Sequence, residues 1–213
     1  KSVYDKYAGL DLAVMFEAVK EIIEYYSIDT SNFISMRIAK PDVAHDIIAD
    51  VKDVITIDGC YTLSEMLTDN RIVFIALGGD KGKSEVDWQT GFYAIAHIVR
   101  KPYDIGYQKG SRGQDYYKFD IKVDWKIDTP ISKEELIAYP DTYNAPYIGL
   151  EIKRDPTQAI CQLEDSKAVA IIRAVIDKYP SSVSKFKVLF SDSFMSRVLG
   201  SVKVSIPLMV DYG

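Results

Sequence analysis

The sequence predicts an α+β fold in which a small β-barrel or a strongly curled sheet carries flanking helices. Strand patterns concentrate in the central third of the chain, over residues 71–127. Amphipathic helix patterns lie on both sides of this centre, at 10–26 and 162–179, and no regular strand–helix–strand alternation links them. The 213 residues are 47% hydrophobic, which is enough for one domain with a sizeable core.

The N-terminal part, residues 1–69, is predicted to be helical and mixed. Residues 10–26 place apolar side chains at helical spacing with charged residues between them. Pro41 suits the first turn of a helix, and an Asp-Gly pair after residue 57 suggests that a strand turns there. We therefore expect four short elements: a strand at 32–38, a helix from Pro41 to about 50, a strand at 54–57, and a helix opened by a Thr62–Glu65 capping box and ending near Leu67.

The centre of the chain shows three strand patterns separated by two long polar loops that contain glycine. Residues 71–77 form a continuous apolar run, which indicates a strand buried on both faces. A second strand is expected over 92–100. Residues 117–127 alternate, which predicts one apolar face formed by Phe119, Ile121, Val123 and Trp125. Loops of this length inside a compact domain are usually functional, so we expect them to form the walls of a pocket.

The C-terminal third combines helix and strand signals. A Ser132–Glu135 capping box predicts a short helix near Leu136, and Pro180 ends the helix expected over 162–179. We expect strands at 148–152, 186–190 and 202–207, with a short helix at 193–198.

The sequence is thus interpreted as one domain, 1–213, with a core at 70–180 and a β-rich closure at 181–213. Because it begins at Lys1 without methionine, we expect it to be a piece of a longer protein.

Charge is distributed unevenly along the chain. The net charge is −5, but residues 71–126 hold 10 basic and 7 acidic side chains, whereas residues 1–70 hold 6 basic and 13 acidic ones. A local positive face matters more for attracting phosphate than the global sum, although a solvated mixed surface explains the same numbers.

The two cysteines, Cys60 and Cys161, fit no metal spacing, and no apolar run approaches the ~18 residues of a membrane span. We expect free thiols and a soluble, cytoplasmic protein.

The sequence offers little for catalysis. Neither His45 nor His97 has a carboxylate or cysteine at ligand spacing, and there is no nucleophile elbow or zinc pattern. We therefore expect no metal, no cofactor and no enzymatic activity. One competing pattern stays open: a Pro-Asp pair followed by Glu-Ile-Lys is typical of Mg²⁺-dependent nucleases, in which acidic residues bind the metal and the lysine orients water. In this chain that nuclease would use Asp141, Glu151 and Lys153.

The central stretch resembles the EVE domains of the PUA-like superfamily, which also contains YTH and SRA-type readers of modified bases. The matching segments are VFIALGGD, a loop ending in Trp88, GFYAIAHIVRKPYD, and YYKFDIKVDWKIDTPISKEEL. Within them the family pattern falls on Gly91–Ile98, Lys101–Tyr103, Phe119–Ile121 and Pro130–Leu136. Residues 148–180 are similar to EVE-type regions of McrB-like, modification-dependent restriction proteins. The resemblance covers about residues 70–180.

The resemblance implies a pocket that receives a flipped, modified base between aromatic side chains. Trp88 stands where the family places a pocket aromatic, and we favour this role over that of a loop tryptophan packed on the barrel. Trp125 suits the core as well as a pocket wall, and Val123 stands where YTH readers have an aromatic wall, so a full YTH-type cage is not implied. The carboxylates before Trp88 are either acceptors for a base amino group or solvated loop charges. The implied pocket comprises Trp88, Asp80, Asp87, Phe92, Val123 and Trp125.

The two polar loops also supply candidates for contacts with the nucleic-acid backbone, although exposed loop charges serve solubility equally well. These candidates are Lys81, Lys83, Lys109, Arg112, Tyr103, Tyr107 and Tyr116, with Tyr117 beside them. The function implied is a DNA-binding specificity module that recognises 5-methylcytosine first and N6-methyladenine second. It would serve a McrBC-type restriction system, whose AAA+ GTPase motor and nuclease lie elsewhere in the chain or on partners. A reader of modified RNA is the remaining alternative.

Overall fold

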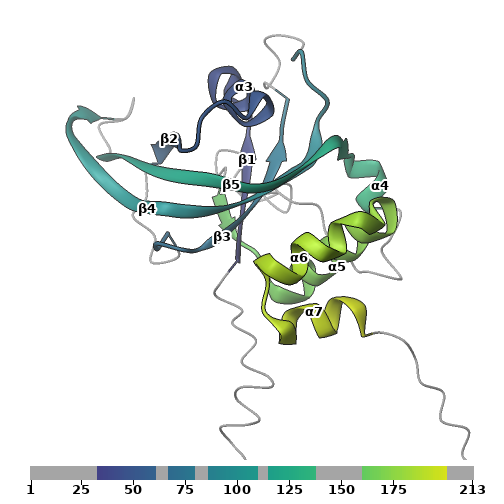
Figure 1. Ribbon diagram of the computed structural model, residues 1–213. Helices are drawn as coiled ribbons and strands as arrows, with labels where there is room; N and C mark the ends of the chain where they lie inside the picture. The colour runs from purple at the N-terminus through teal and green to yellow at the C-terminus, as the bar shows by residue number, and fades with distance from the viewer. Residues whose placement is uncertain (1–32, 61–66, 80–85, 110–114, 138–159, 201–213) are drawn as a thin grey trace, which may run out of the picture.

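A computed structural model describes residues 33–60, 67–79, 86–109, 115–137 and 160–200 (Figure 1). Six strands form one mixed sheet in the order β2-β5-β4-β3-β1-β6, in which β1 and β3 are parallel and the other neighbours antiparallel. The sheet is curled and is not closed into a barrel. The predicted α+β class is therefore confirmed in its curled-sheet form. The strands are β1 Phe33–Ile38, β2 Ile55–Cys60, β3 Ile72–Leu77, β4 Gly91–Lys109, β5 Asp115–Ile131 and β6 Ile160–Gln162.

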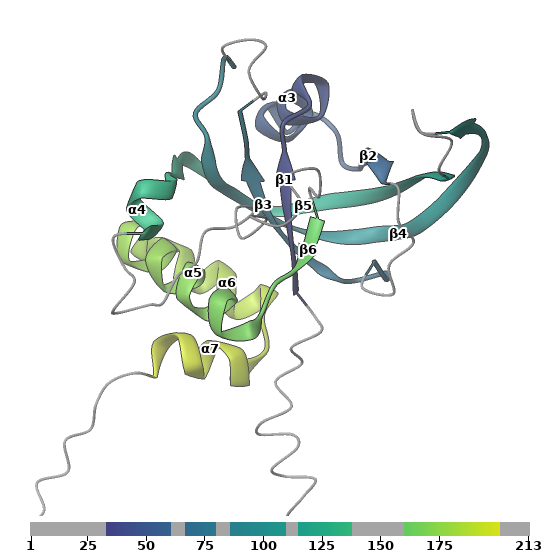
Figure 2. The same ribbon diagram turned by 180° about the vertical axis from the view of Figure 1, so that it is seen from behind.

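The described helices lie at two ends of this sheet. Helix α3 stands apart, whereas α4 to α7 gather together at the opposite end, as both views show (Figures 1 and 2). A 3₁₀ turn over Pro180–Ser182 links α5 to α6. The helices are α3 Pro41–Ala49, α4 Lys133–Ile137, α5 Asp165–Lys178, α6 Val183–Leu189 and α7 Asp192–Leu199. None of the helices in this part of the chain is long and apolar enough to cross a bilayer.

Aromatic side chains fill the layer between the sheet and helices α6 and α7. Phe33 of β1 meets Phe74 edge-on at 5.6 Å and Phe194 of α7 at 5.1 Å, measured between ring centroids. Phe190 stacks on Phe194 at 4.7 Å. All of these rings are buried, so the helices and the sheet share one continuous core. This core makes the central strands a rigid base for the loops that they carry.

Elements with strong local patterns agree with the sequence-based predictions. The strand at 72–77, the helix from Pro41 and the long helix ending before Pro180 are all present. The capping box forms in full: the Ser132 N–H donates to Glu135 Oε2 at 2.7 Å, and the Glu135 N–H donates to Ser132 Oγ at 3.2 Å. Cys161 is a free thiol, and Ser35 Oγ lies 2.8 Å from its Sγ.

The second long loop is not a loop over most of its length. Strand β4 continues to Lys109 and β5 begins at Asp115, so only residues 110–114 separate them along the chain. The alternation of Tyr103, Ile105 and Tyr107 was a strand signal that Asp104 and Gly106, both rare in strands, concealed. The loop predicted over 101–116 is therefore wrong, and a long hairpin stands in its place.

The alternation predicted for the third strand also breaks at one residue. Ile95 of β4 is opposite Trp125 of β5, whereas Ala96 is opposite Val123, so β5 contains one extra residue at Asp124. Opposite residues share a face of the sheet, and neighbours along a strand do not. Val123 and Trp125 consequently lie on opposite faces. The single apolar face predicted through Trp125 is wrong because a bulge cannot be read from alternation.

Two further predictions are corrected. The predicted strand at 186–190 is helix α6, in which Phe186 is buried and Val188 is 84% exposed. The described part of the expected β-rich closure is therefore helical. The Asp-Gly pair at 58–59 lies inside β2, beside a register shift between Ile57 and Cys60, and does not end the strand. The elements predicted at 10–26, 62–65, 148–152 and 202–207 lie outside the described residues.

Candidate nucleic-acid interface

Trp88 is fixed at the point where the chain returns to the sheet before β4. Its indole Nε1–H donates to the carbonyl oxygen of Gly78 at 3.1 Å, and its ring packs against the core. The His45 ring from α3 lies perpendicular to this ring in an edge-to-face contact, with the two ring centroids 5.5 Å apart. Trp88 is only half-buried. The indole is therefore held in one orientation while part of it stays at the surface.

The residue before the tryptophan is held by the same helix. His45 Nε2 lies 2.8 Å from Asp87 Oδ1 and 3.0 Å from Asp87 Oδ2. The His45 and Asp87 side chains are 52% and 71% exposed. The hydrogen bond from His45 lowers the pKa of the Asp87 carboxyl below its ordinary value. Asp87 is thus an ionised, oriented acceptor beside a half-buried indole.

Gly78, where β3 ends, is confined from three directions. Its N–H donates to the carbonyl oxygen of Ile38 at 2.7 Å, and its own carbonyl accepts from Trp88. A Cβ added at Gly78 would lie 2.8 Å from Cγ and 2.9 Å from Cδ of Arg37. Glycine is required here because the stem of Arg37 occupies the space of a side chain. The Arg37 guanidinium forms no ion pair with a described residue.

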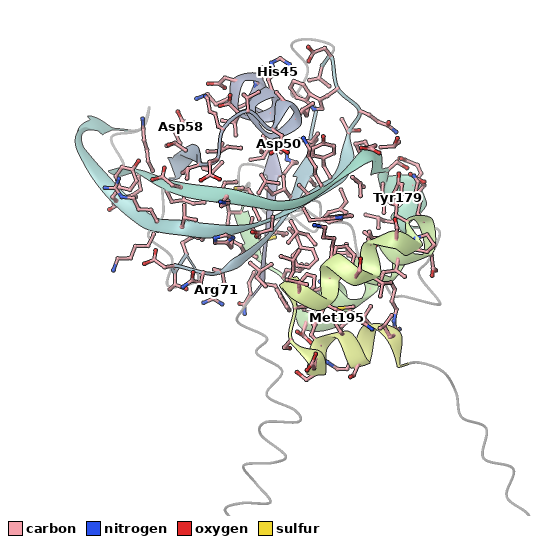
Figure 3. All side chains as sticks on the ribbon, in the orientation of Figure 1. His45, Asp50, Asp58, Arg71, Tyr179 and Met195 are labelled. Carbon is pink, nitrogen blue, oxygen red and sulfur yellow. The ribbon has the colours of Figure 1, made fainter. Side chains whose placement is uncertain are left out.

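Other cations near α3 are committed to neighbouring carboxylates. Lys40 Nζ lies 2.7 Å from Asp58 Oδ2, and this bond raises the pKa of the Lys40 amine. Lys52 Nζ lies 2.7 Å from Asp46 Oδ2. The surface around His45 is therefore mixed in sign, and its distinctive groups are the indole, the imidazole and the ionised carboxylate (Figure 3 labels His45 at the end opposite Met195).

The five described residues of the predicted pocket do not gather in one place. Phe92 is 1% exposed and lies beside Phe74 in the core. Trp125 packs edge-on against Phe186 of α6 at 4.7 Å, and Val123, on the other face of the sheet, is partly buried against the core. Trp88 and Asp87 adjoin each other at the surface. Asp80 lies outside the described residues.

Most of the residues predicted to contact the nucleic-acid backbone have side chains that the structure does not describe. Lys81, Lys83 and Arg112 fall in segments that the structure does not describe. Tyr107, Lys109 and Tyr116 belong to the β4–β5 hairpin, as does Tyr103, whose ring lies 3.8 Å below the guanidinium carbon of Arg100. The hairpin brings together residues that were expected on a loop.

Sequence reasoning missed the part of α3 in this site. His45 and Asp87 are 42 residues apart, and no spacing pattern connects them. The second histidine also has a carboxylate partner, because His97 Nδ1 lies 2.8 Å from Asp124 Oδ2 across β4 and β5. The prediction that both histidines lack such a neighbour holds along the chain but not in space.

No metal centre is found in the described part of the chain. No group of three or more histidine, cysteine or acidic side chains is arranged there to bind a metal ion. Asp141, Glu151 and Lys153, the residues of the competing nuclease pattern, lie outside it. The nuclease hypothesis therefore stays a prediction.

The fold and the surface groups define an α+β domain with a curled mixed sheet and an aromatic–carboxylate cluster at one end. No protein-family model matches the sequence, and no curated protein is similar to it. Solved structures do resemble it. A hypothetical protein from Leishmania major is 14% identical, with a TM-score of 0.52 over 69% of this chain and 96% of that one. This likeness shows a shared fold.

Two human structures are similar at a lower level. One is THYN1 in complex with DNA that contains 5-methylcytosine, at 10% identity and a TM-score of 0.48, covering 66% of this chain and 95% of that one. The other is the DUF55 domain of thymocyte nuclear protein 1, at 11% identity and a TM-score of 0.47, covering 66% and 96%. Because both TM-scores are below 0.5, neither the ligand nor the binding site of these structures is assigned to this chain.

Proposed function

We propose that this chain is a non-catalytic DNA-binding module that recognises a modified base in duplex DNA. The observation that carries the proposal is the surface cluster of His45, Asp87 and Trp88. It combines a fixed aromatic ring with an oriented, ionised hydrogen-bond acceptor at the adjacent residue. These are the two groups needed to hold a base by its face and by its edge.

Trp88 supplies the aromatic ring on which the face of the base would stack. Stacking of a base on an aromatic side chain stabilises binding by about 1–3 kcal/mol. The bond to Gly78 and the edge contact with His45 restrict the indole before any ligand binds, so little conformational entropy is lost on stacking. A methyl group on the base adds dispersion contacts with the ring.

Asp87 supplies the hydrogen-bond acceptor for the edge of the base, and this acceptor favours cytosine. A carboxylate accepts from the exocyclic amino group of cytosine, which is the usual pairing of acidic side chains with that base. N6-methyladenine also has an N–H donor, but methylation leaves it only one. We therefore place 5-methylcytosine first and N6-methyladenine second. Because a paired base keeps its Watson–Crick edge hidden, this contact requires that the base be flipped out of the stack, which costs a few kcal/mol.

The cellular context that we propose is a McrBC-type restriction system. In that system the module would select modified DNA, and an AAA+ GTPase motor with a nuclease subunit would carry out cleavage. Support comes from the sequence resemblance of residues 148–180 to McrB-like proteins. Transformation of a host that expresses the intact system with methylated and unmethylated plasmid tests this context. Selective loss of methylated plasmid supports it, and equal recovery of both plasmids contradicts it.

Binding of the chain to matched duplexes tests the reader itself. Fluorescence anisotropy would compare unmodified, 5-methylcytosine, 5-hydroxymethylcytosine and N6-methyladenine duplexes of one sequence, at one salt concentration and without divalent metal. We expect a preference of about tenfold or more for 5-methylcytosine, which corresponds to about 1.4 kcal/mol.

The other outcomes separate the alternatives. Equal binding to all duplexes contradicts modified-base recognition and leaves a general DNA-binding domain. Tighter binding to an RNA strand of the same sequence favours a modified-RNA reader. Cleavage of plasmid DNA in Mg²⁺ that Lys153→Ala abolishes would establish the nuclease instead.

A further inference from the structure

We infer that the outer part of the β4–β5 hairpin, residues 100–109 and 115–118, binds the phosphate backbone of duplex DNA and lies in its major groove. This segment is called the arm below. The inference rests on the proposed DNA-binding function and concerns a surface separate from the His45–Asp87–Trp88 cluster. It names the element that holds the duplex irrespective of base modification.

The arm concentrates positive charge and aromatic rings in a chain that is acidic overall. Its 14 residues hold four basic and two acidic side chains, a net charge of +2, whereas the whole chain has a net charge of −5. Four of its residues are tyrosines. Basic side chains attract phosphate, and tyrosines add hydroxyl donors and apolar surface. The basic residues are Arg100, Lys101, Lys109 and Lys118, and the acidic ones are Asp104 and Asp115.

The described side chains of the arm form a prearranged cationic surface. The Arg100 guanidinium lies over the Tyr103 ring, with 3.8 Å from its central carbon to the ring centroid. Tyr103 is directly opposite Lys118 in the ladder, so the two side chains share a face. Stacking on an aromatic ring holds a guanidinium in place. The N–H groups of the guanidinium point outward in its own plane, so they can still donate to phosphate oxygens. Arg100, Tyr103 and Lys118 thus present two cations from adjacent strands.

The Asp120 carboxylate adjoins this surface without neutralising it. Asp120 accepts a 2.8 Å hydrogen bond from Thr56 Oγ1 and is only 12% exposed, whereas the Arg100 side chain is 61% exposed. The closest approach between Arg100 Nη1 and Asp120 Oδ2 is 4.0 Å, at the limit of an ion pair. The Asp120 carboxylate faces Thr56 within the sheet, so the guanidinium remains accessible to a ligand.

The arm has the shape that the major groove admits. β2 pairs with β5 only as far as Tyr117, so β4 and β5 continue beyond it as a two-stranded ribbon. Both views show this ribbon running out past β2 with no helix over it (Figures 1 and 2). From Asp104 to Lys109 it extends roughly 17 Å, at about 3.3 Å per residue. The major groove of B-DNA is about 12 Å wide and accepts a two-stranded ribbon.

The same shape argues against an RNA duplex. The major groove of A-form RNA is deep and too narrow for protein side chains to read, so a ribbon that depends on the major groove discriminates between the two helices. The arm therefore favours the DNA reader over the RNA alternative. We expect a duplex RNA of the same sequence to bind at least tenfold more weakly than DNA.

A matched pair of double variants tests the inference. Arg100→Gln with Lys118→Gln removes two charges from the arm. Lys185→Gln with Lys187→Gln removes two charges from the exposed lysines of α6, at the helical end of the molecule. Anisotropy titrations over 50–200 mM salt would give the affinity and its salt slope for unmodified and 5-methylcytosine duplexes. Thermal melts would confirm that both variants are folded.

The arm variant should lose about tenfold or more in affinity at 0.1 M salt, equally for both duplexes. Its salt slope should fall by about 1.8, since each lost phosphate contact removes about 0.9. The α6 variant should match wild type. A competitor that occupies the major groove, such as methyl green, should displace the protein, whereas distamycin in the minor groove should not.

The two proposals can fail separately. An arm variant with an unchanged salt slope, or one no weaker than the α6 variant, overturns the arm inference even if the preference for 5-methylcytosine is present. Displacement by distamycin alone overturns the placement in the major groove. If wild type shows no preference among duplexes while the arm variant still loses affinity and slope, modified-base recognition fails and the arm inference stands.

Discussion

The indole N–H of Trp88 donates to the carbonyl oxygen of Gly78 at 3.1 Å, which ties the segment entering β4 to the residue that follows β3. Trp88→Phe keeps a ring in place but removes this bond. We expect a loss of about 1 kcal/mol, typical for one hydrogen bond, and a fall in melting temperature of about 2–4 °C. Calorimetry checks this. Trp125→Phe is the control, because the Trp125 indole has no hydrogen-bond partner among the described residues; an equal loss in both variants would contradict a specific role for the bond.

Gly78 should not tolerate a side chain while Arg37 is present. Gly78→Ala places a Cβ less than 3 Å from Cγ and Cδ of Arg37, so we expect it to destabilise the fold by about 1–3 kcal/mol. The double variant with Arg37→Ala removes both atoms and should recover most of the loss, which urea denaturation would measure. Gly79→Ala is the matched control, since nothing lies within 4 Å of its added Cβ. A Gly78→Ala protein as stable as Gly79→Ala would show that the stem of Arg37 is free to move away.

The pKa of Asp87 should report its bond to His45. In wild type the carboxyl should titrate below the ordinary aspartate value of about 3.9, and in His45→Phe, which keeps a ring against Trp88, it should return to that value. A carboxyl with a lowered pKa in the folded state stabilises the fold above about pH 4, and this contribution is lost as the pH falls through the folded-state pKa. Carbon-detected NMR of the carboxyl measures the titration. An identical titration in the two proteins would mean that the bond is absent in solution.

Elements with a strong local pattern could be predicted from the sequence. The apolar run of β3, Pro41 at the start of α3 and the Ser132–Glu135 capping box each act over a few residues, so their signals survive without tertiary information. Trp88 and Asp87 could be singled out in the same way, because they adjoin each other in the chain and precede a strand.

Features that depend on contacts between distant segments could not be predicted. The bulge at Asp124 exists only in the pairing of β5 with β4, and it moves Trp125 to the helical face of the sheet. The segment at 186–190 reads as alternating, yet it also fits helical spacing, and packing of Phe186 into the core decides for the helix. His45 joins the candidate site only because the fold brings α3 beside Asp87 and Trp88.

The capping box makes a further prediction about stability. Ser132→Ala removes the acceptor for the Glu135 N–H and should cost about 1 kcal/mol. Glu135 also receives a 2.5 Å hydrogen bond from Lys178 Nζ, which lowers the pKa of the Glu135 carboxyl and links α4 to the end of α5. Denaturant titration checks the loss, with Ser196→Ala in the exposed face of α7 as the control. Equal stability of the two variants would contradict a stabilising cap.

The most direct test of the account compares the two tryptophans in binding. Trp88→Leu and Trp125→Leu make the same chemical change, one at the proposed base site and one beneath α6. The quantity to measure is the ratio of affinities for 5-methylcytosine and unmodified duplexes, by anisotropy at fixed salt. We predict a ratio of about ten or more for wild type and for Trp125→Leu, and a ratio near one for Trp88→Leu, with binding to the unmodified duplex retained. A Trp88→Leu protein that keeps the full ratio would contradict the account.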